Sequence, residues 1–281
     1  MKLFRFGTTD NEKPGVIDGT GIYRDASSLV QDYGRGQLSN AMETLLKADI
    51  SQLPEIPKGS RIANCIPRPG KIICIGLNCV LHAKEAKMDP PSEPIVFMKA
   101  STTISGPFDP ILIPPGSKKT DWEVELGVVI GKDAVCISKE EAKTHIAGYC
   151  LINDVSEREY QLERGGQWVK GKSWDSFCPT GPWMMPEDGS FDAMDLGMRL
   201  WVNGKQFQDG RTNTMIFDIE TVVAYLSNFM RLEEGDLISM GTPSGVGIGQ
   251  NPPVFLSEDD VVELEIDGLG RQRQTCQNWS A

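Results

Sequence analysis

The segment Asp-Trp-Glu-Val-Glu-Leu-Gly-Val-Val-Ile at residues 121–130 carries the pattern of a strand that enters a buried core. Polar and apolar residues alternate at its start, and its far end is continuously apolar. Alternate side chains of a strand face the same way, so Glu123 and Glu125 point to one side and Val124 to the other. Two carboxylates about 6–7 Å apart at the mouth of a core repel each other unless a cation lies between them. Taken alone, however, the pair favours a simpler interpretation, the solvated face of an edge strand.

Further strand patterns follow this segment and predict a largely β large domain. Asn203-Gly204 separates two of them and is a strong hairpin signal. One helix is expected from an N-cap at Asp218 to about Met230, because its apolar residues share one face. Many strands, few helices and Gly/Pro-rich turns together predict a mixed, β-rich α+β fold. The strands expected after residue 70 are 71–76, 94–99, 122–130, 147–153, 198–202, 205–208, 236–240 and 261–266.

Residues 1–66 read as a small N-terminal α/β domain, which precedes a large domain at 67–281. Within it, a hairpin turn is expected at Asp18-Gly19. The segment 51–69 contains four prolines and no clear periodicity, so it is expected to be a linker. The short elements expected before it are strands at 2–6, 14–17 and 21–24 and a weak helix at 39–46.

Composition excludes several classes of protein. The chain has 281 residues, 40% hydrophobic and 24% charged, which is an ordinary globular composition. Its formal net charge of −11, without a basic block, argues against nucleic-acid binding. No apolar run approaches the roughly 20 residues that span a bilayer, and the start lacks a signal peptide, so we expect no membrane contact and a cytoplasmic location. Seven cysteines without a C-x-x-C pair argue against a disulfide framework and a zinc ribbon.

A third carboxylate follows another apolar strand. Asp154 comes directly after the strand expected at 147–153, where a functional carboxylate is often placed. Together with Glu123 and Glu125 it would form an oxygen-only site without His or Cys, which favours Mg²⁺, Mn²⁺ or Ca²⁺ over zinc. The spacing supports equally well an aspartate that ends the strand and caps the next turn.

His82 and Glu85 are three residues apart, in a segment where Asn78 could cap a short helix. Residues with this spacing share a helix face, so the two side chains can form a hydrogen bond. A carboxylate that orients an imidazole makes a competent general base near neutral pH. A surface ion pair is the alternative, and the spacing alone favours it.

Other polar residues could bind a substrate. Arg158 and Gln161 could share a helical turn, and with Lys172 they could hold a carboxylate and a developing oxyanion. Ordinary solvated charge is the better interpretation for any one of them alone. The Gly-rich segment 241–249 matches neither nucleotide-binding pattern, so a flexible turn that presents backbone N–H groups and the Thr242 hydroxyl is expected instead.

Taken together, these segments resemble the fumarylacetoacetate hydrolase family, and in particular its compact bacterial branch of diketo sugar-acid and acylpyruvate hydrolases. Six motifs occur in the family's order between about residues 70 and 270, so their combination is much more specific than any one of them. They are Gly76-Leu77-Asn78 with His82 and Glu85, Asp121–Leu126, Asn153–Arg158, Lys170–Ser173, Cys178–Pro182 and Gly241–Gly247.

The resemblance implies a roll of mixed β-strands as the catalytic domain, usually in a homodimer. It also implies a divalent metal, Mg²⁺ or Mn²⁺, held by Glu123, Glu125 and Asp154. A lid that carries His82 and Glu85 would supply the catalytic pair, with Lys172 assisting. The substrate-binding residues would be Arg158, Gln161 and Thr242.

The expected reaction is hydrolysis of a carbon–carbon bond in a small 2,4-diketo acid, either an acylpyruvate or a diketo-deoxy sugar acid. Decarboxylation of oxaloacetate, hydration, isomerisation and a ureidoglycolate lyase-like activity are alternatives on the same metal site. A non-catalytic metal- or ligand-binding protein is a further alternative, and the intact set of acid, base and metal ligands argues against it.

Overall fold

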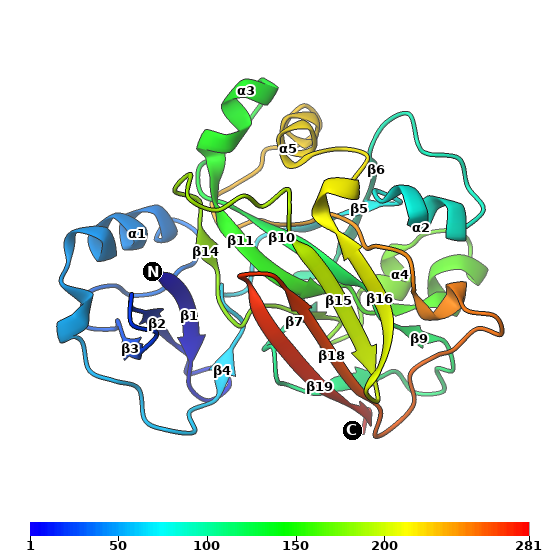
Figure 1. Ribbon diagram of the computed structural model, residues 1–281, viewed down its shortest axis with the longest axis horizontal. Coiled ribbons are helices and arrows are strands. Elements are labelled where there is room, and N and C mark those ends of the chain that lie inside the picture. The colour runs from blue at the N-terminus through cyan, green and yellow to red at the C-terminus, as the bar shows by residue number, and fades with distance from the viewer. Residues whose placement is uncertain (281) are drawn as a thin grey trace.

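The strand predicted at residues 122–130 lies in the middle of a six-stranded mixed sheet (Figure 1). The structure is a computed structural model and describes residues 1–280. The strand order is β14-β11-β10-β17-β5-β6, with every pair antiparallel except β17 and β5. In chain order the strands are β5 (Ile72–Gly76), β6 (Ile95–Lys99), β10 (Val124–Ile130), β11 (Ile146–Asn153), β14 (Met185–Pro186) and β17 (Leu237–Ser239).

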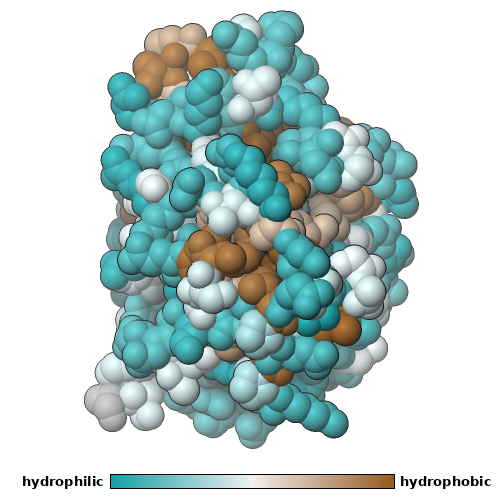
Figure 2. All heavy atoms as spheres, turned by 90° about the vertical axis from the view of Figure 1, so that its left-hand side faces the viewer, coloured by the Kyte–Doolittle hydropathy of each residue, from teal (hydrophilic) through white to brown (hydrophobic). Residues whose placement is uncertain are grey.

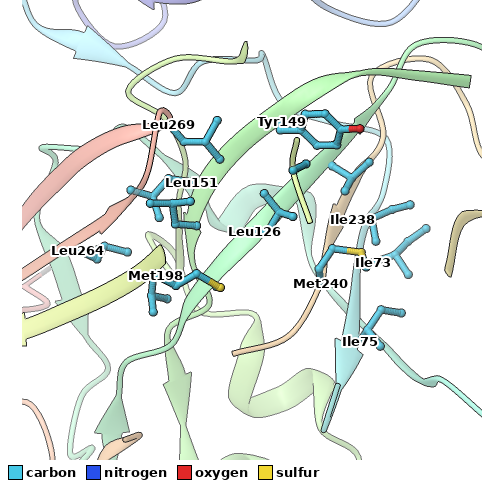
Figure 3. Close-up of a cluster of buried hydrophobic side chains, with 14 of the residues drawn as sticks. Ile73, Ile75, Leu126, Tyr149, Leu151, Met198, Ile238, Met240, Leu264 and Leu269 are labelled. Atoms are coloured by element: carbon cyan, nitrogen blue, oxygen red, sulfur yellow. The ribbon is translucent and has the colours of Figure 1, made fainter. Parts of the chain in front are cut away.

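A five-stranded sheet covers one face of this sheet, and the main core lies between them. Leu126 of β10 and Leu151 of β11 face Met198 and Leu264 of the five-stranded sheet, and all four side chains are buried (Figure 3). The order of the second sheet is β16-β15-β18-β19-β8. Its strands are β8 (Ile111–Ile113), β15 (Gly197–Val202), β16 (Lys205–Arg211), β18 (Val261–Ile266) and β19 (Gly270–Asn278).

The N-terminal part of the chain packs against the other face of the six-stranded sheet. Leu3 and Leu45 from this part share a core cluster with Cys150 and Ile152 of β11. Because Leu151 faces the main core, β11 is buried on both sides, which explains its continuously apolar sequence. The N-terminal elements are helix α1 (Leu38–Lys47) and an antiparallel sheet of β1 (Lys2–Phe6), β2 (Lys13–Ile17), β3 (Tyr23–Asp25) and β4 (Ile62–Ala63).

This N-terminal part forms the left-hand side of the molecule in Figure 1. The face on that side is largely hydrophilic, and hydrophobic side chains gather near its middle and at its upper edge (Figure 2). The division into two domains at residue 66 stays a prediction.

The remaining elements are short. Among residues 1–280, no helix is long and apolar enough to cross a membrane. The other helices are α2 (Val80–Glu85), α3 (Lys139–Ala142), α4 (Val169–Lys172), α5 (Ile219–Ser227) and a π-helical turn at Glu159–Glu163. Single 3-10 turns occupy Ile50–Gln52, Ser101–Thr103, Lys143–His145, Thr212–Thr214 and Gly247–Gly249. Two-stranded pairs join β9 (Thr120–Asp121) to β12 (Ser156–Glu157) and β7 (Ile104–Ser105) to β13 (Cys178–Pro179).

The mixed, β-rich fold class is confirmed, and three local predictions need correction. The segment expected to be a linker contains β4, which pairs with β1. Asn78 does not cap α2, because its side chain donates instead to the carbonyls of Phe217 and Met240. The helix capped by Asp218 ends at Ser227 rather than near Met230. Six of the seven cysteines are buried, as expected for apolar thiols, and Cys136 is exposed.

Candidate active site

Three carboxylates meet where β10 begins and β11 ends. These strands are antiparallel neighbours with Val124 opposite Asn153, so Glu123 and Asp154 lie side by side, and the Asp154 N–H donates to the Glu123 carbonyl at 2.9 Å. Glu125 reaches the same point from within β10. One oxygen of each of the three side chains lies within 4.8 Å of the others, and all three residues are buried. The structure therefore brings together the predicted ligand set, Glu123, Glu125 and Asp154, hereafter the acid cluster.

Cations surround two members of the acid cluster and leave the third without one. Lys172 Nζ donates to Glu123 at 2.7 Å and to Asp154 at 2.8 Å. Arg158 donates to Glu123 at 2.7 Å. Within the described residues 1–280, Glu125 accepts hydrogen bonds only from neutral groups, the Ser239 hydroxyl at 2.6 Å and the Gly241 N–H at 2.8 Å.

The protonation of the acid cluster follows from this arrangement. Burial alone would raise the pKa of Glu123, but Lys172 and Arg158 hold it below its ordinary value. Burial raises the pKa of Glu125 well above its ordinary value, and the Asp154 and Glu123 carboxylates raise it further. Burial alone would also lower the pKa of Lys172, but Asp154 and Glu123 raise it, so Lys172 is a cation and not a base. Glu125 thus lacks a positive partner in an all-oxygen cluster, and this donor set fits a hard divalent cation.

His82 and Glu85 form the predicted pair. His82 Nδ1 lies 3.1 Å from Glu85 Oε2, and the other Glu85 oxygen accepts the Gly245 N–H at 2.9 Å. The carboxylate favours the tautomer with the proton on Nδ1. This leaves Nε2 as the ring nitrogen that can accept a proton from a molecule beside it.

One cavity of about 340 Å³ contains both the pair and part of the acid cluster. Its volume lies near the lower end of the range for small-molecule sites. Asp154 is not a lining residue, although Lys172 Nζ joins it to Glu123, which is. The polar lining residues are His82, Glu85, Glu123, Glu125, Arg158, Gln161, Lys172 and Thr242, and the remaining lining is mainly apolar.

The predicted substrate-binding residues all reach this cavity. Arg158 Nη1 donates to Gln161 Oε1 at 2.9 Å, so the two side chains lie side by side, and the Gln161 amide nitrogen can donate to a ligand. Thr242 has its hydroxyl bound within the protein, since it donates to the Val124 carbonyl at 2.9 Å and accepts from Gln208 at 2.7 Å.

The Gly-rich segment 241–249 presents its N–H groups to carboxylates of the chain itself. Gly241 and Gly245 bind Glu125 and Glu85, as described above. The Gly247 and Ile248 N–H groups donate to Asp121 at 2.6 and 2.9 Å. This segment therefore fixes carboxylates of both the acid cluster and the histidine pair.

Two buried neighbours of the predicted site residues were not predicted. Lys99 is buried at the end of β6 and donates to Asp154 and to the Val155 carbonyl. Asp121 is fully buried and accepts from Arg158 Nε at 2.8 Å, which orients that guanidinium. A signal existed for Lys99, because a lysine that ends an apolar strand needs a carboxylate or carbonyl partner. Asp121 gave no such signal, since its partners lie far away in the sequence.

Comparisons of sequence and structure identify several proteins that are similar to this chain. Residues 71–277 match the model of the fumarylacetoacetate (FAA) hydrolase C-terminal family. A Burkholderia ambifaria protein, provisionally named a hydrolase, is 50% identical over 280 residues, which is 99% of each chain. Among solved structures, fumarylacetoacetate hydrolase from Exiguobacterium antarcticum is 34% identical, with a TM-score of 0.89 over 99% of this chain and 100% of that one.

Two further solved structures bear on the chemistry. Maleylpyruvate hydrolase from Sphingobium sp. SYK-6, in complex with manganese (II) ion and pyruvate, is 30% identical with a TM-score of 0.80. The 5-carboxymethyl-2-hydroxymuconate delta-isomerase from Mycobacterium smegmatis is 29% identical with a TM-score of 0.77. Both similarities cover 100% of each chain.

Proposed function

The chain belongs to the fumarylacetoacetate hydrolase family, and we propose that it is a metal-dependent hydrolase that cleaves a carbon–carbon bond in a small 2,4-diketo acid and releases pyruvate. One observation carries this proposal: two members of the buried acid cluster, Glu123 and Glu125, line the same small cavity as the histidine–glutamate pair. The maleylpyruvate hydrolase that was solved with manganese and pyruvate supports it.

Glu123, Glu125 and Asp154 would hold the metal, with Mg²⁺ or Mn²⁺ favoured and Ca²⁺ compatible with the same donors. When bound, a divalent cation supplies Lewis-acid polarisation of the keto-acid oxygens. Arg158, Gln161 and Lys172 would orient the 2-oxo acid end of the substrate, because each lies beside the acid cluster or donates into the cavity. Lys172 would act as a fixed positive charge, in keeping with its raised pKa.

His82 would act as the general base. Its Nε2 accepts a proton from water, and Glu85 stabilises the imidazolium through Nδ1. The resulting hydroxide attacks the distal ketone, and the bond between that carbon and the central methylene breaks. The products are a carboxylic acid and the enolate of pyruvate, which takes up the proton from His82 at its terminal carbon. All atoms of the water and of the diketo acid are therefore present in these two products.

Isomerisation and decarboxylation are the second candidates, and the similarity to a delta-isomerase favours isomerisation between them. Neither reaction needs an activated water. The His82–Glu85 pair is built to remove a proton, which favours hydrolysis but also suits proton transfer within a substrate.

A substrate panel tests the proposal. The metal-loaded protein should release pyruvate from at least one acylpyruvate or diketo-deoxy sugar acid, with no pyruvate from the protein-free control. Loss of carbon dioxide from oxaloacetate or a shift of a double bond in a muconate, with no diketo-acid cleavage, would replace hydrolysis by one of the alternatives.

A further inference from the structure

The cavity has two chemically different ends. At one end, Arg158 and Lys172 adjoin the acid cluster, and both are bonded to Glu123. The rest of its wall is apolar, and parts of this wall are unusually open to solvent: Met88 is 51% exposed and Leu162 is 48% exposed. The main apolar wall residues are Leu77, Met88, Phe97, Leu162, Trp168 and Ile248.

The aromatic part of this wall is preorganised by packing within the protein. Trp168 contacts Phe97 edge to face, with ring centroids 5.3 Å apart at 63°. Gly76 makes room for the indole, since a Cβ at this position would lie 2.8 Å from the Trp168 ring. The centroid of the Phe97 ring in turn lies 4.9 Å from Lys172 Nζ, so the apolar wall begins directly beside the polar end. A ligand held at the polar end would therefore extend along Phe97 and Trp168.

The apolar wall has no partner for a second charged group of a ligand or for a row of ligand hydroxyls. Within residues 1–280, Arg158 and Lys172 are the only Lys or Arg side chains that line the cavity, and both belong to the polar end. The hydroxyl of Thr242 is already bound to the Val124 carbonyl. A carboxylate placed against Phe97, Leu162 and Trp168 would lose part of its hydration without gaining a partner, which is unfavourable. The net charge of −11 adds to this repulsion.

We propose that the group at the distal end of the substrate is an uncharged, apolar acyl chain, and that Leu162 and Trp168 select it. This inference rests on the proposed function for the identity of the other end, a 2-oxo acid. Of the substrates considered above, it selects acylpyruvates with alkyl or aryl ends over diketo dicarboxylates and diketo sugar acids.

Binding measured without turnover tests the inference. In calorimetric titrations of the manganese-loaded protein, 2-oxoheptanoate should bind more tightly than 2-oxoadipate, which carries a carboxylate at its distal end. Each further methylene that becomes buried along a series of 2-oxo acids should raise the affinity about fourfold. Equal or tighter binding of 2-oxoadipate, or no gain along the series, would overturn the proposal.

A charge placed in the wall provides the matched comparison. Leu162→Arg adds a cation beside the expected acyl chain and should reverse the preference, so that 2-oxoadipate binds more tightly. Leu46→Arg adds the same charge at a 71% exposed position of α1, outside the cavity, and should keep the wild-type preference. If Leu162→Arg and Leu46→Arg showed the same preference between 2-oxoheptanoate and 2-oxoadipate, net charge and not the apolar wall would set the selectivity.

Hydrolysis separates this inference from the proposed function. If alkyl acylpyruvates are cleaved faster than dicarboxylic or polyhydroxylated diketo acids, both stand. If diketo acids with charged ends are cleaved best, the function stands and the inference fails. If no diketo acid is cleaved while the 2-oxoheptanoate preference persists, the hydrolase proposal fails and the selectivity of the wall stands.

Discussion

His82 is the residue whose replacement best separates hydrolysis from the alternatives. If it is the general base for water, His82→Ala should lower kcat/KM for diketo-acid cleavage by about 10²–10⁴-fold and leave metal affinity unchanged. Glu85→Gln should lose less, because the imidazole remains but is poorly oriented. The acidic limb of the kcat/KM profile should flatten in His82→Ala, since protonation of the imidazole no longer matters. Cleavage near the wild-type rate in His82→Ala would make the pair a bystander.

The acid cluster should lose its metal when one ligand is removed. Glu125→Ala is the cleanest variant, because Glu125 has no ionic partner to leave uncompensated. Manganese affinity measured by calorimetry should fall by more than about 100-fold, a larger loss than removing a residue that only orients a ligand. A chelator should abolish activity, and Mg²⁺ or Mn²⁺ should restore it. Full activity in excess chelator after dialysis would remove the metal from the mechanism. Asp154→Ala should be less stable, since it leaves Lys99 buried without its carboxylate.

In the metal-free protein, Glu125 should oppose folding at high pH. The pKa of Glu125 is raised in the folded state by burial and by its neighbouring carboxylates. The stability that this group contributes is therefore present below its unfolded value and is lost as the pH rises through the folded value. Glu125→Gln removes this dependence, so its Tm without metal should exceed that of the wild type at pH 8 and not at pH 4. A shift on the order of 2–4 °C corresponds to about 1 kcal/mol. An equal Tm difference at both pH values would contradict this prediction.

Sequence patterns pointed to residues in short motifs that the structure brings together at the candidate site. The acid cluster and the histidine pair lie close in sequence or directly after strands, so spacing alone brought them into consideration. Asp121 was missed because its role depends on contacts with Arg158 and with residues 247–248, which only the folded chain brings near. Asn78 was assigned a cap from local spacing, whereas its amide joins segments about 140–160 positions away.

The turn at Gly247–Gly249 packs against Glu85 of helix α2 and so helps to position the proposed catalytic pair. A Cβ at Gly249 would lie 2.4 Å from the Glu85 carboxyl carbon, so Gly249→Ala should push this side chain away from His82. We expect kcat to fall about as far as in Glu85→Gln, with manganese affinity unchanged. Gly19→Ala is the control, because a Cβ there meets nothing within 4 Å, and it should leave kcat unchanged. Wild-type kcat in Gly249→Ala would show that Glu85 can shift without cost.

Strand predictions succeeded where burial and periodicity agree. β1 and β18 have their predicted bounds, and β10 and β11 differ by one or two residues. The nine-residue strand β19 was missed, because its sequence Gly-Arg-Gln-Arg-Gln-Thr-Cys-Gln-Asn is mostly polar. Its inward positions include Gln272 and Gln274, which are fully buried and bonded to main-chain carbonyls. Hydropathy cannot detect a strand whose buried face is made of amides.

The whole molecule should be a homodimer, a proposal that rests on family resemblance. Multi-angle light scattering should give about twice the chain mass of 30.9 kDa. An obligate interface should bury more than roughly 1,000 Å² and be apolar at its centre. A single species at the mass of one chain, at the concentration used for activity, would contradict the proposal.

The segment 241–249 holds Glu125, Glu85 and Asp121 through main-chain N–H groups rather than through side chains. Main-chain donors are present whatever the residue, while Gly245 and Gly247 have no room for a Cβ beside the carbonyls of Phe207 and Val254. Sequences that descend from this chain should therefore keep the number of residues and the glycines of this segment, whereas its other positions can vary. An insertion or deletion would move every later donor past its carboxylate at once. Relatives that have lost or exchanged this chemistry should therefore differ in the length of this loop more than in the identity of its residues.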